Sequence, residues 1–192
     1  MTRDPGSADR PTRPTGPADA GIEPNCRGSG YAARMRQIIL LRHAHAHAAG
    51  AGQSDRDRSL SAIGKAEAAA AGRWLAEHGG EVDVVLCSPA ARTMETLAIA
   101  NRDWSTPPPT VRPEIYDASP GDLIRLLDGF AEPARVLLVG HNPGLEELVA
   151  LLADGRSGDR RGLPPGAVAI IELAPEAALE PAVGRVSAFW SP

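Results

Sequence analysis

The stretch QIILLRHAHAHA, residues 37–48, decides the fold because a short apolar run passes directly into a polar loop. Residues 38–41 are two isoleucines and two leucines, which is typical of a strand buried on both faces of a parallel sheet. Similar runs at 82–87 and 135–139 are also followed by helical patterns. This alternation predicts an α/β fold: a three-layer αβα sandwich with a mainly parallel sheet and no large cap insertion.

Capping and stop signals set the expected helices and strands. Ser61 predicts the start of a helix over 62–78, whose apolar positions recur at helical spacing. We expect further helices from Ser88-Pro89 to about 100, from Ser119-Pro120 to about 129, and over 144–153. The Pro-rich segment 104–113 is expected to be irregular, and 167–173 and 183–190 are expected to be two more strands, which could pair. The apolar positions of the first helix are Ile63, Ala66, Ala70 and Trp74.

Length and composition indicate one ordinary domain. The chain has 192 residues, of which 43% are hydrophobic and 23% charged. Residues 1–35 have almost no large apolar side chains, so we expect a flexible extension there and a single domain over 36–192. The net charge of -4 gives no drive toward nucleic acid or anionic membranes, and no apolar run could span a bilayer. With only Cys26 and Cys87, a disulfide framework is not expected, and a cytoplasmic location is the default.

Basic side chains follow three of the expected strands. Arg42 and His43 end the first, Arg92 lies one turn into the helix after the second, and His141 follows the third. Ligands of such sheets bind beyond the carboxyl ends of the strands, so these groups are expected to converge. Arginine forks and helix N-termini suit a phosphate dianion.

A histidine in a phosphate pocket can also react. A neutral imidazole can attack phosphorus, and Arg42 would disfavour protonation of His43. Phosphoryl transfer depends mainly on positioning and on charge stabilisation, which Arg42, Arg92 and His141 would supply. We expect His141 to be protonated when the dianion is bound. On this view neither a metal ion nor a cofactor is needed.

Four motifs then resemble those of the histidine phosphatase superfamily, whose fold is called phosphoglycerate mutase-like, and within it the short SixA-like phosphohistidine phosphatases. ILLRHAHAHA resembles the RHA variant of the family's RHG motif, and SLSAIGKAEAAAAGRWL resembles its Leu-Thr-x-x-Gly helix. VVLCSPAARTMETL is similar to the Ser-Pro-x-x-Arg motif, and LLVGHNPGLEELV is similar to the second-histidine motif. Four motifs in the family's order make the resemblance specific.

The resemblance implies a role for each matching residue. His43 would be the phosphorylated nucleophile, Arg42 and Arg92 would bind phosphate, and His141 would be the second histidine. Asn142 would orient His141 or contact the phosphate, and His45 would bind the phosphate or a flanking group. EIYDAS, residues 114–119, resembles the family's acid-bearing turn, so Asp117 is the first candidate general acid and Glu114 the second.

Plainer interpretations stay open for several of these residues. Asp117 could be an ordinary turn residue, Arg92 could pair with Glu95 or Asp55 on the surface, and Ser88 is expected simply to cap its helix. His43, His45 and His47 alternate, which also invites a metal site, although no Cys or carboxylate cluster accompanies them.

Three functions follow, in order of preference. The first is a phosphatase working through phosphohistidine on a phosphohistidine protein. Imidazole leaves far more easily than an alkoxide, and an uncapped site suits a protein surface. The second is a broad phosphomonoesterase or mutase acting on small phosphate esters. The third is a non-catalytic phosphate-binding module.

Overall fold

One six-stranded sheet forms the centre of the molecule. The computed structural model describes residues 36–130, 135–156 and 162–192. The sheet order is β3-β2-β4-β1-β5-β6. β1 pairs in parallel with β4, and β2 pairs in parallel with β3 and β4. On the other side of β1, β5 pairs antiparallel with β1, and the edge strand β6 pairs antiparallel with β5. The strands are β1 Arg36–Arg42, β2 Val84–Cys87, β3 Thr110–Val111, β4 Arg135–Gly140, β5 Val168–Leu173 and β6 Arg185–Trp190.

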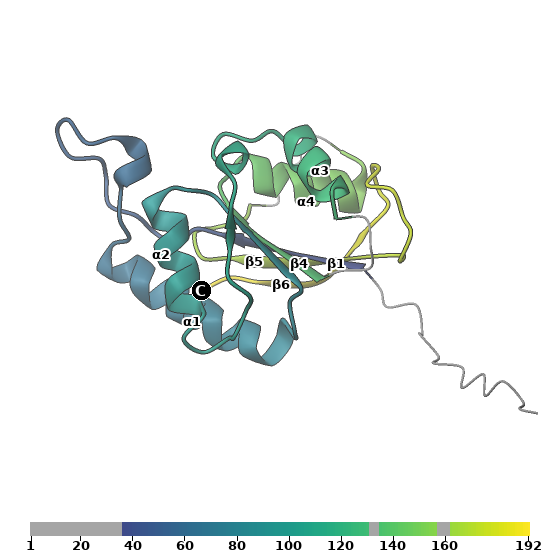
Figure 1. Cartoon of the computed structure of the whole chain (residues 1–192), viewed down its shortest axis with the longest axis horizontal. Coiled ribbons are helices and arrows are strands. Elements are labelled where there is room, and N and C mark those ends of the chain that lie inside the picture. Colours follow the sequence, from purple (N-terminus) through teal and green to yellow (C-terminus); the bar gives the residue numbers. More distant parts are fainter. Residues whose placement is uncertain (1–35, 131–134, 157–161) are drawn as a thin grey trace, which may run out of the picture. The chain divides into compact units, whose positions relative to one another are not determined.

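Helices cover both faces of this sheet. α1 (Ala62–His78) and α2 (Ala91–Ala100) lie on one face, and α3 (Pro120–Asp128) and α4 (Gly144–Asp154) lie on the other (Figure 1). The predicted three-layer αβα sandwich with a mainly parallel sheet is confirmed.

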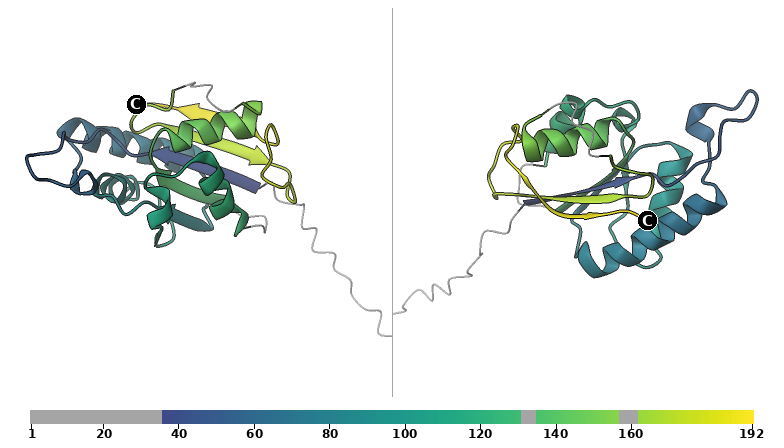
Figure 2. Two further views of the ribbon diagram at one scale, coloured as in Figure 1. Left: turned by 90° about the horizontal axis from the view of Figure 1, so that it is seen from above. Right: turned by 180° about the vertical axis from the view of Figure 1, so that it is seen from behind.

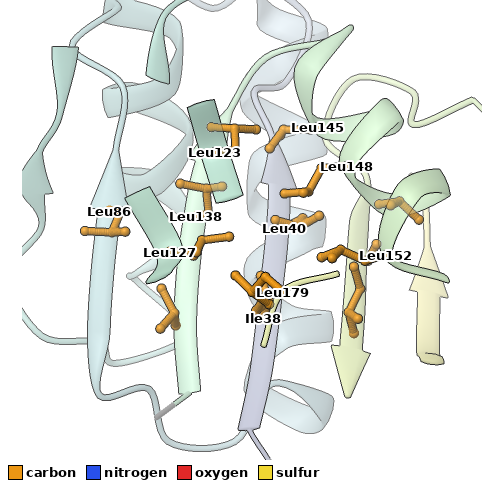
Figure 3. Packing of buried hydrophobic residues seen from close by; sticks show 14 of the residues in the cluster. Ile38, Leu40, Leu86, Leu123, Leu127, Leu138, Leu145, Leu148, Leu152 and Leu179 are labelled. Carbon is orange, nitrogen blue, oxygen red and sulfur yellow. The ribbon is translucent and has the colours of Figure 1, made fainter. Parts of the chain in front are cut away.

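The central strand β1 separates two hydrophobic cores. Ile38 and Leu40 point into the cluster under α3 and α4, which Figure 3 shows together with leucines of both helices. Ile39 and Leu41 point the other way, into the cluster under α1 and α2. All four side chains are fully buried, which explains why β1 is continuously apolar rather than alternating.

Two helix starts follow the sequence closely. The Ser61 side chain accepts a hydrogen bond from the Gly64 amide, and α1 begins at Ala62. Ser119 and Asp122 form a reciprocal capping box at α3. The expected start of α2 is wrong, because that helix begins at Ala91 and Ser88 does not cap it.

The expected inner face of α1 is wrong at Ile63 and Ala66, which are exposed, whereas Trp74 does pack, partly buried, against the core under α1 and α2. Ile63 is 64% exposed, and the buried positions are instead Gly64, Ala68, Ala71, Gly72 and Leu75. The two glycines bring backbone into contact: a Cβ at Gly64 would lie 1.9 Å from the His45 carbonyl oxygen, and one at Gly72 would lie 2.5 Å from that of Ala100. Close approach, rather than large apolar side chains, therefore sets this packing.

The Pro-rich segment contains a short strand that its composition hid. Thr110 and Val111 form β3 beside Leu86 and Cys87 of β2. Cys87 is buried, and this burial raises the pKa of its thiol to about 12.

Strand register positions the candidate site. Arg42 at the end of β1 lies beside Gly140 of β4, and Cys87 of β2 lies beside Val139. His43, Ser88 and His141 therefore leave the sheet at one edge. The loop between β1 and α1 extends beyond this edge, as both views of Figure 2 show.

Two further expectations concern the membrane and the N-terminal segment. Among the described residues, no helix combines the length and the apolar composition that spanning a bilayer requires. The predicted extension over residues 1–35, with Cys26, lies outside the described residues, and the proposed domain division stays a prediction.

Candidate active site

His43 is held in one tautomer by its own backbone. Its Nδ1 lies 2.8 Å from the Ala44 carbonyl oxygen, which can only accept a hydrogen bond. Nδ1 therefore carries the proton, and Nε2 keeps a free lone pair. The backbone is fixed as well, because the His43 amide donates to the Gly140 carbonyl at 3.1 Å.

His141 faces the same point from β4. Its ring centroid lies 5.1 Å from that of His43. Its Nε2 is 2.8 Å from the Ser88 hydroxyl, so Ser88 fixes this ring instead of capping a helix. The Nδ1 atom of His141 is buried and has no hydrogen-bond partner among the described residues.

Both imidazoles are held neutral. Burial, together with the positive charges of Arg92, Arg42 and Arg58, lowers the pKa of His43 to about 4. Burial, followed by the nearby His43 and Arg92, lowers the pKa of His141 to about 3. The predicted effect of Arg42 on His43 is present, but burial is the larger cause.

Arg92 is buried against a loop, not paired on the surface. Its side chain is 6% exposed. Its Nη1 donates to the Asp55 carbonyl oxygen at 2.7 Å, and its Nη2 donates to Asp55 Oδ2 at 3.0 Å. Asp55 lies on a short 3-10 helix, Asp55–Asp57, in the loop between β1 and α1.

Tyr116 joins this network from the segment after β3. Its hydroxyl donates to the same carboxylate oxygen of Asp55, and its ring meets His141 edge-on at 5.4 Å. The guanidinium of Arg56 lies 4.5 Å from the centre of the Tyr116 ring, and that of Arg92 lies 5.6 Å from it. The hydrogen bond between Tyr116 and Asp55 raises the pKa of Tyr116. Together with the charges of Arg92 and Arg58, the same hydrogen bond lowers the pKa of Asp55 to about 2.

Arg42 and Asn142 share one backbone oxygen. Arg42 Nη1 lies 2.6 Å from the Leu163 carbonyl oxygen, and Asn142 Nδ2 lies 3.0 Å from it. Asn142 Nδ2 also donates to Glu146 at 2.8 Å. Among the described residues, Asn142 makes no hydrogen bond with the His141 ring, and its amide nitrogen instead shares the Leu163 carbonyl oxygen with Arg42.

Three other candidates lie further out. His45 is exposed, and its Nδ1 is 2.8 Å from the Ser61 hydroxyl. Asp117 is exposed beside His141, in a hollow of about 390 Å³ that also includes Tyr116 and Asn142. Glu114 pairs weakly with Arg112 at 3.7 Å. Neither acid makes a hydrogen bond with either histidine in the part of the chain described here.

The alternating histidines do not form a metal site in this structure. Within residues 36–130, 135–156 and 162–192, no group of three His, Cys, Asp or Glu side chains could hold a metal ion. The structure thus brings together Arg42, His43, Arg92 and His141, with Asn142 at the side.

Sequence reasoning missed Asp55, Tyr116 and the role of Ser88. The sequence indicates Asp55 only as a surface partner of Arg92; the pairing is present, but the Arg92 side chain is buried. Its position in a loop gave no sign that the chain would bring it back over α2. The tyrosine within EIYDAS was the available signal for Tyr116, since an aromatic residue beside a candidate acid is well placed to line a site.

The depressed pKa values lead to a titration experiment. In an NMR titration, we expect the imidazoles of His43 and His141 to have midpoints near 4 and 3. Because the unfolded chain titrates near pH 6.5, it binds more protons between that pH and 4, and stability should decrease as pH falls through this window. Midpoints near 6.5 for the two buried rings would contradict the electrostatic description of the site.

Comparison with known proteins identifies the family. Residues 38–132 match the model of the histidine phosphatase superfamily, branch 1. An uncharacterized protein of Mycobacterium tuberculosis is 33% identical over 138 residues, which cover 67% of this chain and 85% of that protein.

Solved structures agree with this match. The provisionally assigned phosphohistidine phosphatase SixA of Nakamurella multipartitia is 31% identical, with a TM-score of 0.70 over 82% of this chain and 96% of that one. The protein histidine phosphatase SixA, solved in complex with tungstate, is 27% identical, with a TM-score of 0.70 over 81% of this chain and 97% of that one. The chain therefore belongs to the histidine phosphatase superfamily, in its SixA-like branch.

Proposed function

We propose that the protein is a metal-independent phosphohistidine phosphatase that forms a covalent intermediate on His43. The observation that carries this proposal is the fixed, neutral His43 imidazole, whose free Nε2 lies in a site shared with His141 and Arg92. The substrate class follows the SixA proteins that the chain resembles.

In the first step, His43 Nε2 forms a bond to phosphorus while the bond from phosphorus to the leaving group breaks. Arg42 and Arg92 balance charge on the phosphoryl oxygens. The negative charge of the bound phosphoryl group raises the pKa of His141. The protonated ring then donates a hydrogen bond from Nδ1 to a phosphoryl oxygen. In the second step, a water oxygen attacks phosphorus, the bond to Nε2 breaks, and phosphate leaves with the water protons shared between it and solvent.

The leaving group decides the substrate class. When a phosphohistidine carries a proton on its second ring nitrogen, breaking the P–N bond releases a neutral imidazole. The leaving nitrogen therefore needs no proton from the enzyme. An alkoxide needs a strong acid close by. In the described part of the site, Asp117 and Glu114 are exposed and unbonded to the histidines, and Asp55, with a pKa of about 2, stays ionised. The site therefore favours a phosphohistidine over an alkyl phosphate.

A substrate comparison tests this proposal. The protein is assayed on a phosphorylated histidine-containing transfer domain and on a panel of small alkyl phosphates. We expect the larger kcat/KM on the phosphoprotein. The Asp117→Asn variant should keep that activity and lose what ester hydrolysis there is, because only the ester needs the acid.

Two results would contradict it. Higher efficiency on the small esters would indicate a broad phosphomonoesterase. Loss of activity after exhaustive chelation, with recovery on adding a divalent cation, would overturn metal independence.

A further inference from the structure

Asp55 links three elements of the site. Its backbone oxygen and its Oδ2 accept from the two terminal nitrogens of Arg92 in α2. The same Oδ2 accepts from the Tyr116 hydroxyl, and Oδ1 accepts from Arg58 Nε at 2.8 Å. One loop residue thus touches α2, the segment after β3 and its own loop.

The loop that bears Asp55 is itself well fixed. The Ser54 side chain caps the short helix Asp55–Asp57, and Gln53 Nε2 donates to the Asp57 carbonyl oxygen at 2.8 Å. Arg58 Nη1 donates to the His47 carbonyl oxygen at 2.9 Å. These hydrogen bonds hold the Asp55 backbone in place beside Arg92, although the Asp55 side chain is 53% exposed.

These contacts divide the guanidinium of Arg92. One hydrogen of each terminal nitrogen is used by Asp55, which holds the group in a single orientation. Nε is buried and has no hydrogen-bond partner among the described residues, so the edge formed by Nε and the terminal nitrogen beside it keeps N–H groups that Asp55 does not use, and such an edge matches a bidentate oxyanion. A guanidinium left to rotate would present this edge only part of the time.

We infer that Asp55 is a positioning residue for phosphoryl transfer: it holds Arg92 with its Nε edge toward the phosphoryl group and ties Tyr116 against His141. The inference deepens the proposed function and rests on it for the identity of the bound oxyanion. Asp55 does not donate or accept a proton in the reaction, because its carboxylate is committed to Arg92, Arg58 and Tyr116.

The direction in which anion affinity changes when the Asp55 charge is removed tells whether Asp55 positions Arg92 or competes with substrate for it. If Asp55 merely occupied Arg92 in place of substrate, removing its negative charge would strengthen anion binding, as Coulomb's law requires for a charge this close. If Asp55 positions Arg92, the same change weakens binding even though the site becomes more positive.

Tungstate is a suitable oxyanion probe, and calorimetry on the whole protein gives its Kd. We expect Asp55→Ala to weaken tungstate binding by roughly tenfold, as for loss of one or two hydrogen bonds to a charged group. Asp55→Asn keeps an oxygen acceptor and should recover part of this loss. Asp57→Ala removes an exposed carboxylate from the same short helix and should leave the Kd unchanged. Melting temperatures of all variants report whether the fold is kept.

Tighter or unchanged binding in a folded Asp55→Ala protein would overturn the inference, and so would a wild-type protein that binds no tungstate. Turnover gives the second measurement: we expect a lower kcat on phosphohistidine for Asp55→Ala, with partial rescue by Asp55→Asn. Failure of the proposed function is distinguishable, because it would show as no phosphohistidine turnover by wild-type protein, whereas the tungstate series would still decide the role of Asp55.

Discussion

Replacement of His43 by alanine is expected to abolish turnover, with a loss of roughly 10³-fold or more, since the residue proposed to form the covalent bond is removed. The wild-type protein, quenched during turnover with labelled substrate, should carry an acid-labile, base-stable phosphoryl group. His43→Ala should carry none. Because Arg42 and Arg92 remain, the variant should still bind tungstate, which separates chemistry from binding.

His78→Ala is the matched control for this experiment. His78 lies at the far end of α1, where its Nδ1 hydrogen-bonds the Trp74 carbonyl oxygen at 2.9 Å. Its replacement should leave the phosphoenzyme and the rate unchanged. A His43→Ala protein that still turns over would exclude the covalent mechanism, and a wild type with tight phosphate binding but no turnover would indicate a binding module.

Gly64→Ala is expected to reduce the free energy of unfolding by about 2–3 kcal/mol, as for overpacking of a close contact. The added Cβ would lie 1.9 Å from the His45 carbonyl oxygen, which also accepts a hydrogen bond from the Ser61 amide at 3.0 Å. The variant should also lose activity, because the strained segment is the one that carries His43. Chemical denaturation and kcat measure the two effects.

Gly121→Ala is the control for the same substitution in an open position. A Cβ there meets atoms no closer than 3.8 Å. Because alanine restricts the unfolded chain, this change should raise stability by about 0.5–1 kcal/mol. Equal effects at both glycines would show that α1 does not pack against the His45 backbone as described.

The sequence predicted the features that are local or periodic. Apolar runs gave the buried strands, Ser61 and Ser119 gave two helix starts, and the strand ends gave the convergence of His43, Arg92 and His141. The inner face of α1 was missed because glycine and alanine carry little hydrophobic signal, although they allow the closest packing. Asp55 and Tyr116 were missed because their meeting depends on the path of a loop, and loop paths have no periodicity from which to infer them.

The place of β1 within the sheet has a consequence for synthesis of the chain. β1 leaves the ribosome before any other described strand, but its neighbours in the sheet are β4 and β5. Ile38, for example, cannot pair until its partners Val136 and Ile171 have been synthesised. Such distant pairings are slow to form and cannot begin until most of the polypeptide has been translated. Nascent chains that stop before β4 would therefore carry the nucleophile without the histidine and sheet edge that make it reactive, and activity would arise only near completion.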